Sequence, residues 1–475
     1  MQKKLILFGI DGLEPSLVNA FVTQKKLKTF SSPSFSVKLR STFPPDSYLA
    51  WPSIFTGQNL TAFIHDIIAD DLSPSRLGYY VRDRIAGNTF WDKVGSHRYR
   101  VCVINPFLGF PPWKVNGLMI SGPVGIENGI PISFPEWVTR RYNVPRMGGI
   151  LEGFSLLPWE YGAFYRNCCY ETKEMSRLTA EVIKDGDFDL VFVTYLTLDR
   201  IEHSFWRFAD LNDPDKSLLN IYRDSLANFY ILLDKTIEIF LKKFGNEYTI
   251  AAFGDHGHGP RPYYLLALNE LLRRMKMLDV GQERIFRKLK ELVTVMAFQI
   301  LYTSGLDSFA YRICRKLLGS VRFRHKNFSR ISGISTSPLF GFKQYGALKM
   351  AGGSCREKES YEDVISLLHS YGLLEQTYAG EKESAFSEVS PCAVFKLDDR
   401  IGLYHRLYAP LIMKNFTRKL ISGGHKDITA MYVWNSNGKL RQSKCSGSII
   451  EIFSSILEFF GLRTIQDSHL WHFYD

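Results

Sequence analysis

The chain has 475 residues, 45% of them hydrophobic and 14% aromatic, which is enough for a large core and suggests two or three domains. Its net charge of +11 and pI near 9.1 favour anionic partners such as phosphate esters, nucleic acid or acidic lipid headgroups. Seven cysteines without a CxxC pair argue against a disulfide framework and indicate reduced thiols in a cytoplasmic setting.

No apolar stretch has the pattern of a signal peptide or of a membrane span. The apolar run at residues 5–10 ends at Asp11 and is too short for the core of a signal peptide. A later apolar stretch, residues 292–306, is shorter than the ~20 residues that a spanning helix needs. We therefore expect a soluble, cytoplasmic protein with at most peripheral membrane contact.

The first two candidate site residues are Asp11, which follows the first predicted strand, and Ser47, which begins a predicted helix. Residues 4–9 read as a strand that delivers Asp11 to its carboxyl end, although an Asp-Gly pair is common in ordinary turns. Ser47 falls at the predicted start of a helix. It is either an N-cap or a hydroxyl placed where helix amides favour an anion such as a phosphate. Thr42 and Ser53 are alternatives for the second role.

The strongest predicted buried strand covers residues 189–196 and is followed by an acid and a histidine. Asp199 and His203 are four residues apart, so one helical turn puts both on the same face. This spacing suits a metal site, although an isolated pair of this kind is more often a surface pair. A long amphipathic helix is then predicted at residues 218–243.

A second strand, residues 248–253, ends in the sequence Gly-Asp-His-Gly-His-Gly. The glycines allow a tight turn and a close approach of the backbone to a ligand. Asp255 and His256 offer the oxygen and imidazole ligands that suit zinc or a similar divalent ion. A polar turn is an equally good interpretation of this segment when it is taken alone.

Residues 261–385 differ from the rest in pattern and are predicted to form a cap. The stretches 265–277 and 283–316 have helical, strongly basic patterns, and residues 308–330 contain seven Lys or Arg and no acid. These charges either face solvent or present a positive surface to an anionic substrate or membrane. We expect peripheral contact of this basic cap with an anionic membrane, and no specific nucleic-acid partner.

The core pattern returns after residue 390, with strands at 392–395 and 428–434 and a last helix at 447–460. Because strands and helices alternate, we predict a mostly parallel α/β core formed by residues 1–260 and 386–475, with the cap at 261–385 inserted between them. Ligands bind beyond the carboxyl ends of strands in such sheets. We therefore expect Asp11, Asp199 and Asp255 to lie along one edge of the sheet.

The ordered set of motifs resembles the type I phosphodiesterase/nucleotide pyrophosphatase family of the alkaline phosphatase superfamily. The motifs are D-G at 11–12, T-F-P-P-x-[ST]-x-x-A-W-P-S-x-x-T-G at 42–57, D-x-x-x-H at 199–203, D-H-G at 255–257 and G-x-H at 423–425. The resemblance runs from residue 4 to about residue 460, with the cap poorly matched. It implies an alkaline-phosphatase-like three-layer α/β/α core with a mostly parallel central sheet and an inserted, largely helical cap.

The resemblance also implies a site with two divalent ions, zinc first and manganese or magnesium as alternatives. The ligands of the first ion would be Asp199, His203 and His425. The second ion would be held by Asp11, Asp255 and His256 and would touch Ser47. Ser47 stands at the family's nucleophile position, so a phosphoseryl intermediate is expected during hydrolysis of a phosphodiester or pyrophosphate bond in a small, nucleotide-type substrate.

Two further residues are candidates for substrate binding. Trp51 either stacks on a base of the substrate or packs in the core, and packing is favoured. His258 stands where the family more often has an apolar residue. It is either a more distant donor to the site or a solvent-exposed bystander, and the bystander role is favoured. The loop from Asn59 to His65 departs from the family pattern, which leaves the choice of substrate open.

Two other interpretations compete with a diesterase. One is a different activity of the superfamily, namely a phosphonate hydrolase, phosphomonoesterase or phosphoryl transferase; no C/S-x-P-x-R motif supports a sulfatase. A monoesterase would need an additional cation for the extra charge of its substrate, and no such cation is identified from the sequence. The other is a non-catalytic scaffold that binds membrane or nucleic acid through the basic cap, which the complete set of predicted ligands disfavours.

Overall fold

The computed structural model describes residues 3–60, 81–122, 131–145, 156–210, 213, 220–279, 285–306, 308–310, 312–313, 332–339, 342–351, 358–379, 393–404, 406–435, 440–462 and 468–473. The basic segment at 308–330 and the loop at 59–65 therefore fall largely outside the described residues. In the described part, no helix is both long and apolar enough to cross a membrane. The described cysteines, Cys102, Cys168, Cys169 and Cys445, are free.

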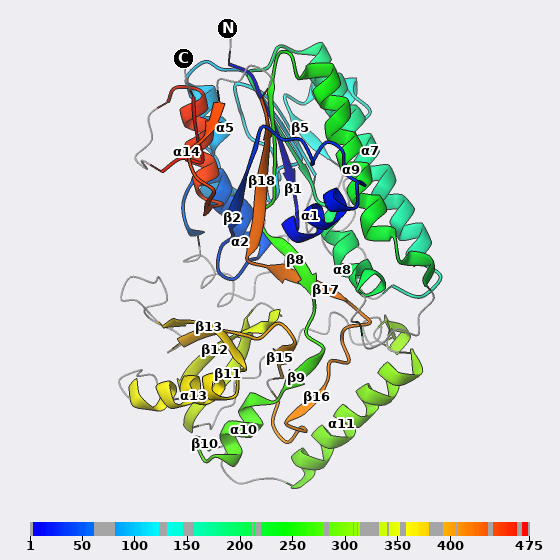
Figure 1. Cartoon of the computed structure of the whole chain (residues 1–475), viewed down its shortest axis with the longest axis vertical. Helices are drawn as coiled ribbons and strands as arrows, with labels where there is room; N and C mark the ends of the chain where they lie inside the picture. Colours follow the sequence, from blue (N-terminus) through cyan, green and yellow to red (C-terminus); the bar gives the residue numbers. More distant parts are fainter. Residues whose placement is uncertain are drawn as a thin grey trace.

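A nine-stranded sheet in the order β20-β2-β18-β7-β1-β6-β3-β4-β5 forms the centre of the larger part of the molecule (Figure 1). Its central strands β7, β1, β6, β3 and β4 run parallel, whereas β18 and β5 are antiparallel to their neighbours. The strands are β1 (Leu5–Ile10), β2 (Phe35–Arg40), β3 (Val101–Ile104), β4 (Gly117–Ser121), β5 (Ile132–Phe134), β6 (Leu190–Tyr195), β7 (Thr249–Phe253), β18 (Ile428–Trp434) and β20 (Ser446–Ser448). The mostly parallel sheet of the sequence analysis is confirmed.

Helices cover both faces of this sheet, because its strands are apolar on both sides. Ile6 and Phe8 of β1 belong to one core cluster, and Leu5 and Leu7 belong to the other. The first face is covered by α1 (Pro15–Thr23), α7 (Tyr161–Asp185), α8 (Thr197–Ala209) and α9 (Ser225–Phe244). The second is covered by α2 (Ser47–Thr56), α5 (Phe90–Ser96) and α14 (Glu451–Phe459). These layers form the predicted three-layer α/β/α core.

The smaller part of the molecule contains an antiparallel sheet that the sequence analysis did not predict (Figure 1). Its strands are β10 (Leu278–Asp279), β11 (Ser332–Leu339), β12 (Phe342–Ala351), β13 (Leu374–Ala379) and β14 (Ala393–Leu397). Helices α10 (Leu268–Arg274), α11 (Ile285–Ser304) and α13 (Lys358–Ser370) accompany it. The sheet thus includes a strand, β14, from the segment that the sequence analysis assigned to the core.

Short strands connect the two parts of the molecule. β9 (Tyr264–Leu266) lies between β15 (Ile401–Leu403) and β16 (Ile412–Lys414), and β8 (Gly257–Pro260) pairs antiparallel with β17 (Gly423–Lys426). The remaining elements are α6 (Trp137–Arg141), a 3-10 turn at Asn220–Tyr222, β19 (Leu440–Gln442) and β21 (Trp471–Phe473). The β8–β17 pair matters most for function, because it brings the chain after β7 next to residue 425.

Candidate active site

The three predicted acids follow neighbouring parallel strands of the central sheet. β1 lies between β6 and β7, with Ile10 opposite Tyr195 and Gly9 opposite Phe253. Asp11, Asp199 and Asp255 come shortly after these strands and are 3%, 7% and 0% exposed. The topology therefore brings the three carboxylates to the carboxyl edge of the sheet, as the sequence analysis expected.

Ser47 lies in the first turn of α2 and points into the same place. The helix is capped by Asp46, whose side chain accepts a hydrogen bond from the Tyr48 amide, so the alternative of Ser47 as N-cap is wrong. Ser47 Oγ lies 3.3 Å from Asp11 Oδ1 and 3.0 Å from His256 Nε2. Thr42 and Ser53 are occupied elsewhere, because Thr42 donates to Pro44 O and Ser53 accepts from Leu60 N.

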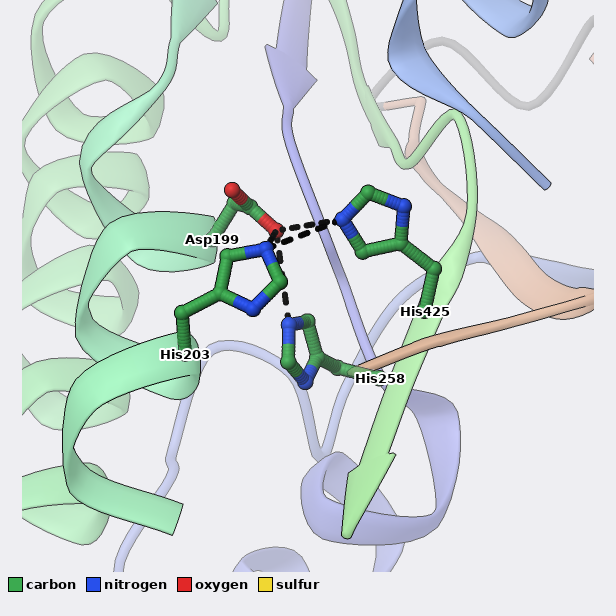
Figure 2. Close-up of side chains that lie close together, drawn as sticks. All are labelled: Asp199, His203, His258 and His425. Carbon is green, nitrogen blue, oxygen red and sulfur yellow. Dashed lines mark hydrogen bonds and ion pairs between the residues drawn. The ribbon is translucent and has the colours of Figure 1, made fainter. Parts of the chain in front are cut away.

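The first predicted ligand set comes together around one carboxylate oxygen (Figure 2). Asp199 Oδ1 lies 3.3 Å from Nε2 of His203, one turn along α8, and 3.3 Å from Nε2 of His425 in β17. The two histidine Nε2 atoms are 3.0 Å apart. Residues separated by more than two hundred positions thus converge on a single point, where their donor atoms lie close enough to share one cation.

The second predicted set lies next to the first. His256 Nε2 is 3.5 Å from Asp11 Oδ1 and 3.5 Å from Asp255 Oδ2, and the His256 ring stacks on His425 with ring centres 3.8 Å apart. The closest grouping of donor atoms here is Asp11, Asp199 and His256, so Asp199 belongs to both sets. Asp255 stays adjacent and accepts a hydrogen bond from Gly12 N.

Backbone carbonyl groups fix the orientation of three histidine rings. Nδ1 of His203 donates to Gly423 O, Nδ1 of His425 to Pro45 O and Nδ1 of His256 to Gly257 O. A carbonyl oxygen only accepts, so the proton of each neutral ring is on Nδ1 and the lone pair is on Nε2. This is the arrangement in which histidine binds metal ions in proteins. All three Nε2 atoms face the cluster.

The cluster contains buried carboxylates, whose negative charge a bound cation would balance. Burial and the neighbouring carboxylates Asp255 and Asp199 raise the pKa of Asp11 well above its usual range, and burial raises the pKa of Asp255 in the same way. Burial also lowers the pKa of His425 to about 3, which keeps its imidazole neutral. In the described part of the chain, Asp199 Oδ1 and Asp255 Oδ2 are buried without a hydrogen-bond partner. The residues therefore fit a divalent metal centre.

Trp51 and His258, the two candidates for substrate binding, are both buried. Trp51 is completely buried among Phe55, Phe192 and Phe253, which is the packing role, and its Nε1 donates to Asp11 Oδ2 over 3.1 Å. A ring so enclosed cannot stack on a substrate base. The expectation that His258 is solvent-exposed is wrong. It is 2% exposed, and its Nε2 lies 3.4 Å from Asp199 Oδ1.

Sequence reasoning missed a cation beside the first set. Arg261 follows β8, and its amide donates to Ser422 O next to β17. Burial lowers the pKa of His203, and the nearby charge of Arg261 adds to this effect. Burial also lowers the pKa of Arg261 to about 10, so the guanidinium stays charged at neutral pH. The only signal in the sequence was its position two residues after the Gly-His-Gly turn.

The chain is similar in fold to solved structures of other proteins. A crystal structure of phosphonoacetate hydrolase from Sinorhizobium meliloti matches with a TM-score of 0.51 and 12% identity over 96% of this chain and 95% of that chain. Human ectonucleotide pyrophosphatase/phosphodiesterase 5 matches with a TM-score of 0.47 and 10% identity over 98% and 97% of the two chains. A search of curated protein sequences found no match.

The fold is of the alkaline-phosphatase-like α/β class. Residues 5–302 match the type I phosphodiesterase/nucleotide pyrophosphatase family, and the chain belongs to this family. It is therefore an enzyme, and its superfamily uses divalent metal ions.

Proposed function

We propose that the chain is a metal-dependent hydrolase of phosphodiester or pyrophosphate bonds in small, nucleotide-type substrates, with Ser47 as the nucleophile. The observation that carries this proposal is the position of Ser47 Oγ, 3.0 Å from His256 Nε2 and 3.3 Å from Asp11 Oδ1. A hydroxyl beside two prospective metal ligands is where a nucleophile for phosphoryl transfer needs to be.

The residues of the cluster would hold two divalent ions, for which zinc suits the mixture of imidazole and carboxylate donors. Asp199, His203 and His425 would hold the first, and Asp11, Asp255, His256 and Ser47 the second. When bound, such ions neutralise the charge of a phosphate ester and make a serine hydroxyl a better nucleophile.

The chain itself supplies the nucleophile and its surroundings. Ser47 Oγ would attack phosphorus, forming an Oγ–P bond while the bond to the leaving oxygen breaks, and water would then cleave the phosphoserine to release the product. Ser47 lies in the first turn of α2, where free amides favour a phosphate oxygen. Asp46 caps this helix by accepting a hydrogen bond from the Tyr48 amide, and desolvation raises its pKa to about 6.

A second candidate, a phosphomonoesterase or phosphonate hydrolase, is favoured by Arg261. A monoester carries one more negative charge than a diester, and a cation beside the first ligand set is suited to it. The structural neighbour from Sinorhizobium meliloti acts on phosphonoacetate, whose carboxylate is likewise an additional charge. Arg261→Gln would lower turnover of monoesters more than of diesters under this alternative.

The test compares bis-p-nitrophenyl phosphate with p-nitrophenyl phosphate, using protein loaded with zinc or manganese and the same protein treated with EDTA. We expect faster turnover of the diester, lost with EDTA. A preference for the monoester would overturn the diesterase assignment. No turnover of either ester with any added metal would favour a non-catalytic scaffold. A screen of nucleotide, dinucleotide and phospholipid-headgroup diesters then identifies the substrate class.

A further inference from the structure

His258 lies in the cluster although no role follows for it from the proposed mechanism. It belongs to β8 and is paired directly opposite His425 of β17. Its amide donates to Glu14 Oε2 over 2.9 Å, and its ring stacks on Trp206 with ring centres 5.5 Å apart. Figure 2 shows its ring pointing toward Asp199, beside the rings of His203 and His425.

The ring of His258 is buried without a hydrogen bond. Among the residues that the structure describes, neither Nδ1 nor Nε2 has a hydrogen-bond partner, and the same holds for Asp199 Oδ1, which lies 3.4 Å from Nε2. A polar group that is buried without a hydrogen bond destabilises the folded protein. A cation between His258 Nε2 and Asp199 Oδ1 would give these two atoms a partner, because both would then bind it.

We propose that His258 is a fourth protein ligand of the first metal ion, beside Asp199, His203 and His425; this inference rests on the proposed function. The distances from Asp199 Oδ1 to the three Nε2 atoms are nearly equal, at 3.3, 3.3 and 3.4 Å. The donor atoms of all four residues lie within 4.8 Å of one another.

The backbone next to His258 leaves room for this ring. A Cβ on Gly423 would lie 2.4 Å from Cε1 of His258, closer than two carbon atoms can approach. The same Cβ would lie 2.4 Å from the backbone oxygen of Glu202, so a residue other than glycine at position 423 would disturb the packing of β17 against both the ring and α8. The same glycine supplies the carbonyl that orients His203, so one residue serves two rings of the set.

A fourth protein ligand predicts a distinct metal preference. A set of three imidazoles and one carboxylate suits zinc and similar transition metals and is poorly suited to magnesium, which prefers oxygen ligands. It also predicts tighter retention of the first ion than of the second, whose set contains a single imidazole.

The test measures metal binding in protein stripped with a chelator. Zinc is titrated in competition with a chromophoric chelator, and the visible spectrum of the cobalt-substituted protein reports the coordination of each ion. The variants are His258→Phe and His258→Gln, because glutamine can still donate a hydrogen bond to Asp199 but is a poor zinc ligand. His97→Gln, which removes an exposed histidine, is the matched control, and circular dichroism monitors folding.

We expect wild-type protein and His97→Gln to bind two ions with the same spectrum. Both His258 variants should weaken the first ion about 10- to 100-fold and change the cobalt spectrum of that ion alone. If His258→Gln matches the wild type in affinity and spectrum, His258 is not a ligand, whereas the proposed function stands. If the wild type binds no ion, the proposed function fails together with this inference.

An independent observation concerns the outer surface of α11, which runs along the edge of the smaller part of the molecule (Figure 1). Five large apolar side chains at helical spacing are exposed on it: Leu289 56%, Leu292 43%, Val293 56%, Met296 56% and Ile300 62%. The opposite side of the helix is anchored, with Val295 and Tyr302 each 3% exposed. Soluble proteins rarely expose contiguous apolar patches, so this outer stripe is typical of an interaction surface.

We infer that this stripe docks on an anionic lipid surface. Exposed Lys288 and Lys290 lie beside the stripe. Residues 308–330, which follow in the sequence, carry seven Lys or Arg and no acid, and one of these, Arg312, pairs with Glu160. An apolar face bordered by cations is typical of helices that lie in the membrane interface. A protein partner with a matching apolar surface would not need this excess of positive charge.

The test is sedimentation of the full chain with vesicles of pure phosphatidylcholine and with vesicles rich in phosphatidylserine. The variant is Leu292→Ser/Met296→Ser, and Ile239→Ser, which removes an equally exposed side chain from α9, is the control. We expect the wild type and the control to bind the anionic vesicles in a salt-dependent way and the double variant to bind at least about 10-fold more weakly.

Absence of wild-type binding to the anionic vesicles would overturn this inference. Equal binding of the double variant would overturn it as well, because charge alone would then explain the attachment. Light scattering detects self-association, in which the stripes of two copies of the chain would pair. In that case the vesicles would sediment without protein, and the inference would fail.

Discussion

Nε2 of His203 and Nε2 of His425 lie 3.0 Å apart, although Nδ1 of each ring donates to a backbone carbonyl. With the proton of each neutral ring on Nδ1, the lone pairs of the two Nε2 atoms face each other, and they repel at this distance. A cation between the two atoms turns the repulsion into attraction. The cluster is therefore stabilised by a positive charge that its own residues do not supply.

Removal of metal should destabilise the folded protein. A ligand present at about 1,000 times its dissociation constant stabilises the native state by about 4 kcal/mol, and chelation removes this contribution. We expect EDTA to lower the melting temperature by several degrees and excess zinc to restore it. Calorimetry with Asp199→Asn is the control, since this variant should respond to EDTA much less. An unchanged melting temperature in the wild type would show that the cluster is stable without a cation.

Replacement of Ser47 should abolish turnover without emptying the site. Ser47→Ala removes the attacking oxygen, and we expect a loss of at least about 1,000-fold in kcat. Metal content should stay near that of the wild type, because three other side chains remain in the second set. Ser47→Thr keeps a hydroxyl and should retain measurable activity. Wild-type rates in Ser47→Ala would mean that another group attacks phosphorus.

The hydrogen bond from Trp51 to Asp11 should strengthen binding of the second metal ion. Trp51→Phe keeps an aromatic ring in the core but removes the N–H that holds Asp11 Oδ2. We expect the second ion to bind about 10-fold more weakly. Trp91→Phe is a matched control, because Trp91 lies fully buried in the same core and its Nε1 has no hydrogen-bond partner among the described residues. Equal metal affinities in the two variants would deny Trp51 this role.

Stability in acid should depend on Glu270 in the smaller part of the molecule. Its carboxylate accepts hydrogen bonds from Arg273, Arg274 and Tyr408 N, which outweigh burial and hold its pKa at about 2. A depressed pKa means that the stabilisation is complete above pH ~4.5 and is lost as the pH falls toward 2. Glu270→Gln should cost about 1–2 kcal/mol at neutral pH, a figure reduced for solvent screening.

The measurement for Glu270 is urea denaturation at several pH values between 7 and about 2. The difference in unfolding free energy between wild type and Glu270→Gln should shrink as the pH falls. Glu238→Gln, in the exposed pair with Lys242, should leave the transition nearly unchanged at every pH. A difference between wild type and Glu270→Gln that stays constant with pH would contradict the role of its charge.

The sequence predicts the positions of the acids because parallel strands impose a common edge. Asp11, Asp199 and Asp255 each follow an apolar strand, and strands of one sheet end together. His425 has no such local signal. Its place follows only from the resemblance to a family, and the structure brings it to the cluster through the pairing of β17 with β8.

Other features of the site have no signature in a single sequence. The carbonyls of Pro45, Gly257 and Gly423 orient the histidines, but every residue has a carbonyl and only the fold decides where it points. His258 was expected to be a solvent-exposed bystander because it departs from the family pattern, whereas it pairs opposite His425 and is buried. The sheet of β10–β14 was missed because residues 261–385 were interpreted as a largely helical cap, although β11 and β12 are neighbours in the chain and pair antiparallel.

Anomalous diffraction at the zinc edge from crystals of the zinc-loaded protein tests the central claim most directly. The account predicts two peaks, one among Asp199, His203 and His425 and one between Ser47 Oγ and the side chains of Asp11, Asp255 and His256. A single peak away from Ser47, or none at saturating zinc, would contradict it.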